Sequence, residues 1–403
     1  MKQVLIWDLN FRLKNSGGPA GYLYNIKTYI DTLTEDSHIT FLSDIYSQNN
    51  QIKNSKIAEK TKKLNNFFLR PFTDIYRTFR FLRNKCPKEI LQHVDLSLFD
   101  VIHFHNPIDL YLASNIISSY RGIILLTSHS PEPIASELVN HIYNDRKSIF
   151  RQLSYALFAS AERQAFRRAN YIMFPTIYSS EPYMADKKLK EILISKKEVT
   201  RWCPTAILDV DLGDKNQCYF KDLCGTPVNN FNIVYLGRHN EVKGYDDLKK
   251  IAKVIFSRHK NASFIIGGLQ GPIESLQHEQ WVELGWTNKA AEIIRNADVF
   301  ILPNRQTYFD LIALEVLRAG TPIIMTNTGG NKYFAEIAVN GEGIYIYDRC
   351  DMGTCIEAIE QLMAAKQDGS INILGKKNRE LWKKYFTLPQ YLNNYRNMIE
   401  SLC

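Results

Sequence analysis

The sequence predicts an α/β protein with two doubly wound, Rossmann-like domains that face a cleft. Short runs of β-branched and other apolar residues alternate with longer helical patterns, and the whole series repeats in the second half of the chain. Apolar strands that are each followed by a helix are typical of parallel sheets buried on both faces. A length of 403 residues also exceeds one ordinary core and favours two domains.

The expected strands fall into two series. Those of the first half are Val4–Trp7, Ile39–Leu42, Val101–Phe104, Ile123–Thr127 and Tyr171–Phe174, with helical patterns such as Pro19–Leu33 and Ser148–Arg168 between them. Those of the second half are Asn232–Gly237, Ser263–Gly268, Val299–Pro303 and Pro322–Met325. The polar stretch Cys203–Asn230 has several prolines and glycines and little periodicity, so we expect the domain boundary there, with a first domain over residues 1–205.

The composition is that of an ordinary globular protein, with 45% hydrophobic and 23% charged residues. Seven cysteines are scattered without metal-ligand or redox spacing, which favours reduced thiols in a cytosolic protein. The first residues lack the features of a signal peptide, and no apolar run approaches the roughly 20 residues that span a bilayer. We therefore expect a cytoplasmic protein, soluble or peripheral on the inner face of the membrane.

The formal net charge of +8 is concentrated in Gln51–Ile90, which holds 11 Lys/Arg and 3 Asp/Glu. Aromatic residues recur at intervals near three to four across Phe72–Phe81, as on one helical face, and Arg77, Arg80 and Arg83 flank them. This pattern favours docking on an anionic membrane surface. The alternative is that the aromatic side chains pack into the core and the Lys/Arg side chains form a solvated face.

Two cations follow a strand of the second half. Arg238 and Lys243 lie between the strand Asn232–Gly237 and a helix that begins near Gly244. Ligands of open α/β sheets bind beyond the carboxyl ends of the strands, where helix starts expose backbone N–H groups. Two cations there can converge on a leaving diphosphate, whose charge grows as a glycosidic bond breaks. The alternative is an ordinary solvated loop.

The segment Asn304–Ile324 places Glu315 inside an otherwise apolar helix. A carboxylate there needs a donor, which the two hydroxyls of a ribose or an arginine elsewhere in the fold would supply. Thr307 and Asp310 have the spacing of a helix-capping pair, with Thr307 at the cap. We expect the backbone amides of Tyr308, Phe309, Asp310 and Leu311 to face an anion above the sheet.

Two further features lie in the first half. Gly17 and Gly18, in a loop after the first strand, allow the backbone to approach a phosphate or a sugar. His129 directly follows a strand, where it can hydrogen-bond a sugar hydroxyl or transfer a proton, although a lone histidine is more often structural. His103 and His105 resemble a metal-binding pair but have no carboxylate at useful spacing, so we expect no metal.

The order of these features resembles the retaining glycosyltransferases of the GT-B fold, especially the family 4 group of bacterial polysaccharide and glycolipid enzymes. The family's glycine–arginine–lysine–glycine turn matches Gly237, Arg238, Lys243 and Gly244, and its glutamate-containing helix matches Phe309, Leu311, Leu314, Glu315, Gly320 and Pro322. The glycine loop, His129 and the helical Glu162 also occur in the family's order, and the resemblance covers about Trp7 to Tyr347.

The resemblance implies a sugar transfer, with retention, from a nucleoside-diphosphate sugar to a glycan or lipid-linked acceptor. Arg238 and Lys243 would bind the diphosphate, Glu315 the ribose, and His129 the sugar. Gly285, Trp286 and Thr287 would bracket the base, and the Phe309–Leu311 amides would hold sugar or phosphate. Residues 1–205 would serve the acceptor, residues 206–385 the donor, and the helix in residues 386–403 would cross back to the first domain.

The sequence departs from the family at two positions, because Thr307 replaces the first glutamate of its paired-glutamate helix and Asp310 replaces a glycine. Three alternatives stay open. A sugar-nucleotide epimerase of the same fold would share most of these motifs. A nucleic-acid-binding protein would use residues 51–90, but no nucleic-acid module surrounds them, so we expect no nucleic-acid partner. A metal-dependent transferase would use Asp209-Val210-Asp211, but no strand end precedes this motif.

Overall fold

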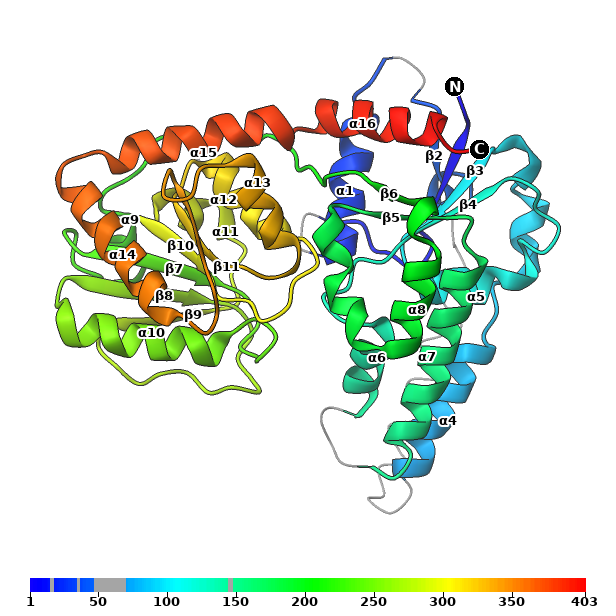
Figure 1. Ribbon diagram of the computed structural model, residues 1–403, viewed down its shortest axis with the longest axis horizontal. Helices are drawn as coiled ribbons and strands as arrows, with labels where there is room; N and C mark the ends of the chain where they lie inside the picture. Colours follow the sequence, from blue (N-terminus) through cyan, green and yellow to red (C-terminus); the bar gives the residue numbers. More distant parts are fainter. Residues whose placement is uncertain (15–17, 35–36, 47–69, 144–147) are drawn as a thin grey trace. The chain divides into compact units, whose positions relative to one another are not determined.

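The computed structural model describes residues 1–14, 18–34, 37–46, 70–143 and 148–403. The chain divides into two compact units, each built on one parallel sheet (Figure 1). The first unit comprises Met1–Phe174, Glu181–Cys203 and Asn394–Cys403, and the second comprises Pro175–Ser180 and Pro204–Asn393. The predicted fold class, two doubly wound α/β domains, is confirmed.

The first unit has a six-stranded sheet with the order β2-β1-β3-β4-β5-β6. Its strands are β1 (Val4–Trp7), β2 (Ile39–Phe41), β3 (Val101–Phe104), β4 (Ile123–Thr127), β5 (Tyr171–Phe174) and β6 (Thr200–Trp202). β1, β3 and β5 are buried along their whole length, as expected of central parallel strands covered on both faces. The strand order reverses between β1 and β3, which is where doubly wound sheets bind ligands.

Helices and short turns connect the strands of the first unit. The helices are α1 (Gly18–Ile30), α2 (Leu42–Ile45), α4 (Arg70–Arg83), α5 (Pro107–Leu112), α6 (Ile134–Tyr143), α7 (Arg151–Arg168) and α8 (Lys187–Ser195). The last helix, α16 (Leu388–Glu400), begins in the second unit and ends in the first. Its Tyr395 hydroxyl lies 2.8 Å from Nδ1 of His103 on β3, so the end of the chain packs against the first sheet.

The second unit has a six-stranded sheet with the order β12-β11-β10-β7-β8-β9. Its strands are β7 (Phe231–Leu236), β8 (Ala262–Gly267), β9 (Trp281–Gly285), β10 (Val299–Leu302), β11 (Ile323–Thr326) and β12 (Ile344–Tyr347). Its helices are α9 (Tyr219–Cys224), α10 (Tyr245–Arg258), α11 (Ala290–Asn296), α12 (Leu311–Ala319), α13 (Phe334–Ile337), α14 (Met352–Gln367) and α15 (Ile371–Tyr385). Apolar side chains of α10, α14, β7 and β8 form one continuous core. The order reverses between β7 and β10.

Every strand expected from the sequence corresponds to one in the structure, and β6, β9 and β12 were not foreseen. The expected helices Pro19–Leu33 and Ser148–Arg168 correspond to α1 and α7, with ends that differ by up to three residues. In the described ranges, every helix is too short or too polar to cross a membrane.

Candidate functional site

The turn between β7 and α10 lies where the strand order of the second sheet reverses. Gly244 occupies the N-cap of α10 in the left-handed region, at φ +67°, and a Cβ there would lie 1.7 Å from the carbonyl oxygen of Pro303. A Cβ at Gly268 would lie 1.9 Å from the carbonyl oxygen of Gly237. Glycine is therefore required at both positions, and it brings the loops after β7, β8 and β10 into contact.

The two predicted cations of this turn have different surroundings. The Arg238 side chain is exposed, and its guanidinium makes no hydrogen bond or ion pair with any residue that the structure describes. Lys243 is half-buried and donates hydrogen bonds of 2.9 and 2.8 Å to the two carboxylate oxygens of Asp310. One cation is thus available to a ligand, while the other is already paired.

Asp310 links the loop after β7 to the loop after β10. Besides Lys243, the side-chain amide of Asn304 donates a hydrogen bond to it. Burial alone would raise the pKa of Asp310, but the charge of Lys243 and these hydrogen bonds outweigh burial and hold the pKa below its usual value. Asp310 is therefore ionised at neutral pH, and it neutralises a lysine at the edge where anions would bind.

The predicted capping pair is wrong. α12 begins at Leu311 with Asp310 at the N-cap, and the Asp310 side chain makes no cap hydrogen bond because it binds Lys243 instead. The chain before the helix is held by a glycine pair after β11, since a Cβ at Gly329 would lie 1.9 Å from the carbonyl oxygen of Thr307. Thr307 is consequently a fully buried loop residue, and not the start of a helix.

Apolar packing orients the remainder of this loop. Tyr308, Phe309 and Leu311 are buried. The Phe309 ring stacks on the Phe334 ring at 5.6 Å between centroids. A Cβ at Gly330 would lie 2.2 Å from the carbonyl oxygen of Tyr308, so the loop and the glycine pair pack backbone to backbone. The loop from Thr307 to Leu311 is therefore held rigidly beside the turn that carries Lys243.

Glu315 lies in the middle of α12. Within the described ranges its carboxylate makes no hydrogen bond or ion pair, and burial raises its pKa against the opposing charge of Arg318. Arg318 instead donates a 2.7 Å hydrogen bond to the carbonyl oxygen of Leu208. The Glu315 carboxylate thus has the charge of Arg318 nearby but no hydrogen-bond donor among the described residues.

The carboxyl ends of β7, β8 and β9 are tied together by backbone hydrogen bonds. The amide of Gly237 donates to the carbonyl oxygen of Gly267 at 2.9 Å, and that of Gly268 donates to Gly285 at 2.8 Å. Beyond this edge the Trp286 side chain is 71% exposed, while the Thr287 hydroxyl accepts a hydrogen bond from the Lys289 amide. The structure thus brings the predicted residues at 237 and 285–287 to one edge, with an aromatic ring open to a flat ligand.

The first unit brings His129 together with residues of two other elements. Gly18 begins α1, whereas Gly17 lies outside the described residues. The Tyr22 ring of α1 lies 4.6 Å from the His129 ring, and Nε2 of His129 is 3.0 Å from Nδ1 of His105. Burial lowers the pKa of His129 to about 3, so this histidine is a neutral hydrogen-bonding group at physiological pH.

The loop that carries His129 is held by buried polar contacts. The Glu162 carboxylate of α7 accepts hydrogen bonds from the amides of Ile134 and Ala135 at the start of α6. The Tyr183 hydroxyl lies 2.8 Å from both the Ser128 hydroxyl and the Ser130 carbonyl oxygen. Burial raises the pKa of Glu162 to about 7. These contacts fix the backbone on both sides of His129.

His103, near His129 in the first unit, lies within hydrogen-bond distance of two side-chain hydroxyls. His103 lies 2.8 Å from both the Tyr395 hydroxyl and the Thr127 hydroxyl, which agrees with the structural interpretation of His103 and His105. In the part of the chain that the structure describes, no three His, Cys, Asp or Glu side chains are grouped as a metal would need.

Sequence reasoning missed several residues of the second unit's site. Asn304 and the glycines at 268, 329 and 330 hold the loops but were not singled out. The sequence Asn327–Gly330 places two glycines in the loop after a strand, which is the same signal that identified the Gly17–Gly18 loop. Asn304 gives no comparable signal, because its partner Asp310 is recognised only once the loop is folded.

Comparisons with known proteins agree with this architecture. Residues 230–365 match the family "Glycosyl transferases group 1". An uncharacterized glycosyltransferase of Methanocaldococcus jannaschii is 23% identical over 265 residues, which are 61% of this chain and 62% of that protein. A capsular polysaccharide biosynthesis glycosyltransferase of Staphylococcus aureus, CapM, is 27% identical over 143 residues, 33% of this chain and 37% of that one.

A solved structure is similar over the full chain. Anabaena HepE in complex with UDP-glucose superposes with a TM-score of 0.60 at 12% identity, covering 100% of both chains. The curated relatives above are matched over less than two thirds of their own length. Residues 230–365 of the second unit therefore carry a group 1 glycosyltransferase domain, and the chain as a whole has the GT-B fold of its structural relatives. The expected resemblance to GT-B glycosyltransferases is thereby confirmed.

Proposed function

We propose that this protein transfers a sugar, a hexose, from a nucleoside-diphosphate sugar to a glycan or lipid-linked acceptor in the synthesis of a cell-surface polysaccharide or glycoconjugate. The proposal rests on the carboxyl edge of the second sheet where the strand order reverses, between β7 and β10, which we call the reversal point. There Arg238, whose guanidinium pairs with no described residue, lies on the same turn as Lys243, and Lys243 binds Asp310 in the rigid loop from Thr307 to Leu311. Polysaccharide biosynthesis in the name of CapM and UDP-glucose in the HepE complex support this choice of substrates.

In this proposal Arg238 and Lys243 bind the donor diphosphate and stabilise its negative charge as it leaves. The Glu315 carboxylate accepts hydrogen bonds from the ribose, and Gly285, Trp286 and Thr287 border the base. Backbone amides of Tyr308, Phe309, Asp310 and Leu311 face the sugar or the phosphates. Gly237 and the Gly17–Gly18 loop allow close approach of the backbone.

The neutral His129 would hydrogen-bond the transferred sugar, held in place by His105 and Tyr22. We expect transfer with retention through front-face attack assisted by the leaving phosphate. No metal or other cofactor is expected, and the first unit would present the acceptor. These roles assume cytoplasmic donor and acceptor pools.

A transfer assay tests the proposal. Thermal-shift measurements with UDP, GDP and ADP select the nucleotide, and mass spectrometry then follows the matching nucleotide sugars with lipid-linked and glycan acceptors. We expect a glycosylated product and free nucleoside diphosphate, formed about 10²–10³-fold more slowly by Arg238→Ala and at the wild-type rate by Lys253→Ala, an exposed control on α10. An epimerised donor without transfer would favour a sugar-nucleotide epimerase, and turnover unaffected by Arg238→Ala would refute the assigned site.

We also propose that α4 docks the protein on an anionic membrane surface. Residues 47–69, the larger part of the basic segment, lie outside the described residues. In α4 the Phe72, Tyr76 and Phe79 side chains are 59%, 63% and 44% exposed, while Ile75 and Leu82 are buried. The aromatic residues recur at i, i+4 and i+7, so they share a face that stays open to solvent.

Exposed arginines, Arg80 and Arg83, lie on the same turns of α4, and each basic side chain near an anionic leaflet contributes about 1 kcal/mol. Flotation with phosphatidylglycerol vesicles at low salt should recover the protein with the lipid. Recovery should fall in Arg80→Glu/Arg83→Glu and stay unchanged in the control Lys187→Glu/Lys188→Glu on α8. Failure of the wild-type protein to float would exclude docking and favour a soluble acceptor.

A further inference from the structure

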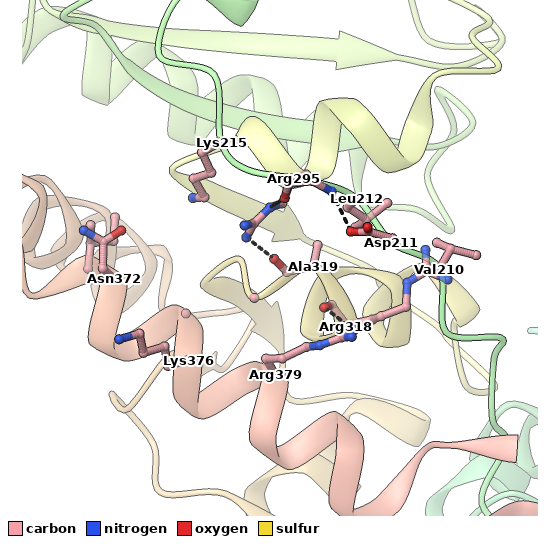
Figure 2. Close-up of a pocket in the computed structure, with 14 residues that line it drawn as sticks. Val210, Asp211, Leu212, Lys215, Arg295, Arg318, Ala319, Asn372, Lys376 and Arg379 are labelled. Atoms are coloured by element: carbon pink, nitrogen blue, oxygen red, sulfur yellow. Dashed lines mark hydrogen bonds between the residues drawn. The ribbon is translucent and has the colours of Figure 1, made fainter. Parts of the chain in front are cut away.

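The second unit contains a cavity far from the proposed donor site. It has a volume of about 510 Å³ and is bordered by residues 210–215, the last turns of α11 and α12, and one face of α15 (Figure 2). In a βαβ unit a helix ends at the amino edge of the next strand, whereas ligands in this fold bind at the carboxyl edge. The cavity therefore lies at the opposite edge of the sheet from Arg238 and Lys243.

The residues that line this cavity are strongly basic. Five of them are cations and Asp211 is their one carboxylate; the cations are Lys215, Arg295, Arg318, Lys376 and Arg379. Figure 2 shows these side chains reaching the cavity from four separate segments of the chain. Arg379 forms an ion pair with Asp209 at 2.7 Å. Even with this pair, the lining keeps a surplus of positive charge.

Several of the cations are held in place by backbone carbonyls. Arg295 donates to the carbonyl oxygens of Gly213 and Ala319 at 3.1 and 2.9 Å, and Arg379 donates to that of Arg318 at 2.8 Å. Arg318 and Ala319 are the last residues of α12, so these contacts also cap the helix. The carboxyl end of a helix carries only about half a negative charge, which does not balance five cations.

The donors of the cavity are not all used. Arg318 is 7% exposed, and its Nε is buried without a hydrogen-bond partner among the described residues. Lys376 is exposed and makes no hydrogen bond or ion pair with any residue in the described ranges. Lys215 donates a 3.0 Å hydrogen bond to the carbonyl oxygen of Ala297. Burial lowers the pKa of Lys215 to about 8; the charge of Asp298 opposes this decrease, and repulsion from Arg295 adds to it. A buried guanidinium donor without a partner and mutually repelling cations are the features of a site that lacks its anion.

Two glycines shape the floor of the cavity. Gly320 ends α12 with φ +67°, and a Cβ at Gly375 of α15 would lie 2.3 Å from the carbonyl oxygen of Gly320. The close approach of α12 and α15 at these glycines lets Arg379 of α15 lie beside Arg318 of α12, with Lys376 on the preceding turn of α15. Larger residues would separate the helices and disperse the cations.

We propose that this cavity binds a phosphate-bearing anion of the size of a diphosphate or a sugar phosphate. Its volume lies in the range of small-molecule sites, about 300–1,000 Å³. Planar guanidinium groups bind phosphate oxygens in pairs, and ammonium groups add charge from flexible stems. The phosphate can come from a free metabolite or from a lipid headgroup. The proposal is independent of the donor site.

Calorimetric titration with inorganic pyrophosphate tests this site in the full chain. Because pyrophosphate would also bind the donor site, the titration uses the Arg238→Ala background. We expect binding to persist there, and to weaken at least tenfold when Lys215→Gln and Lys376→Gln are added. These two changes remove the ammonium groups of the cavity and leave the arginines that cap α12 intact. Lys253→Gln, added to the same background, serves as the control and should leave the affinity unchanged.

Vesicles then identify the source of the phosphate. If phosphatidic acid vesicles compete with pyrophosphate, the natural ligand is a lipid headgroup. If they do not compete, it is a free phosphorylated compound. Both results support the site. Absence of pyrophosphate binding in the Arg238→Ala background would overturn the proposal, because any binding by the wild-type protein would then belong to the donor site. Equal affinity in the variants with and without Lys215→Gln and Lys376→Gln would overturn it as well.

Discussion

Replacing Lys243 by alanine tests the ion pair that joins the loops after β7 and β10. The substitution removes two hydrogen bonds, of 2.9 and 2.8 Å, and leaves the Asp310 carboxylate, 18% exposed, without a cation. Hydrogen bonds to charged groups contribute about 1.5–3 kcal/mol, and fully exposed pairs about 0–1 kcal/mol. For this half-buried pair we expect the free energy of unfolding to fall by about 1–3 kcal/mol.

The same substitution should have a separate effect on catalysis. Loss of one charge-assisted donor to the leaving diphosphate lowers the rate by about 10²–10³. Asp310→Asn should also destabilise the fold, but it leaves the charge of Lys243 available and removes a negative charge near the phosphates. We therefore expect nucleoside-diphosphate affinity to be retained or increased in Asp310→Asn. Both variants should thus be less stable than the wild-type protein, but only Lys243→Ala should lose activity.

Urea unfolding and steady-state kinetics on Lys243→Ala, Asp310→Asn and the double variant measure both effects. The double variant should unfold near Asp310→Asn alone, because the pair is already broken there. Lys250→Ala is a matched control: Lys250 pairs with Asp247 at 2.8 Å on α10 but is 59% exposed, so we expect less than about 1 kcal/mol and unchanged kinetics. Equal losses of activity in Lys243→Ala and Asp310→Asn would refute the reasoning, because the Lys243–Asp310 ion pair would then have only a structural role.

Three further variants extend these expectations. Arg238→Ala should lower kcat/KM about 10²–10³-fold and change the free energy of unfolding by less than about 0.5 kcal/mol, since Arg238 is exposed and pairs with no described residue; a comparable loss of stability would contradict this. Glu315→Gln should weaken nucleoside-diphosphate binding at least about tenfold in calorimetry without lowering the melting temperature, and the reverse outcome would make Glu315 structural. In the folded protein the pKa of Glu162 is raised to about 7, so its protonation stabilises the fold fully below about pH 4.5 and this contribution disappears as pH rises through 7. Glu162→Gln should remove that dependence, worth up to about 3 kcal/mol in urea unfolding across this window, and an unchanged pH profile would contradict the raised pKa.

The sequence predicted the central strands because they are continuous apolar runs. β6, β9 and β12 escaped prediction for a physical reason: each lies at the edge of its sheet and is only partly buried, so its residues need not all be apolar. The Glu283 within β9 illustrates this, because it accepts a hydrogen bond from the Tyr245 hydroxyl at the sheet's border. Local hydrophobicity therefore identifies the centre of a parallel sheet better than its margins.

For the candidate site, Arg238 and Lys243 were singled out because ligands bind at strand ends, and Glu315 because a carboxylate inside an apolar helix needs a donor. The ion pair between Lys243 and Asp310 was not foreseen, because 67 residues separate the partners. Thr307 was misassigned as a cap since a threonine three residues before an acid fits the motif, but packing against Gly329 overrides that local preference. The basic cavity likewise escaped prediction, because its cations come from segments that only folding brings together.

The most direct test of the central claim is a calorimetric titration of UDP, GDP and ADP into the wild-type protein and Arg238→Ala. If the reversal point of the second sheet holds the diphosphate of the donor, one of these nucleotides binds the wild-type protein at one site. Its dissociation constant should lie between about 1 µM and 1 mM, the usual range of enzyme–substrate recognition, and should rise at least about tenfold in Arg238→Ala. Equal affinity in the two proteins, or no binding of any of the three nucleotides, would contradict the claim.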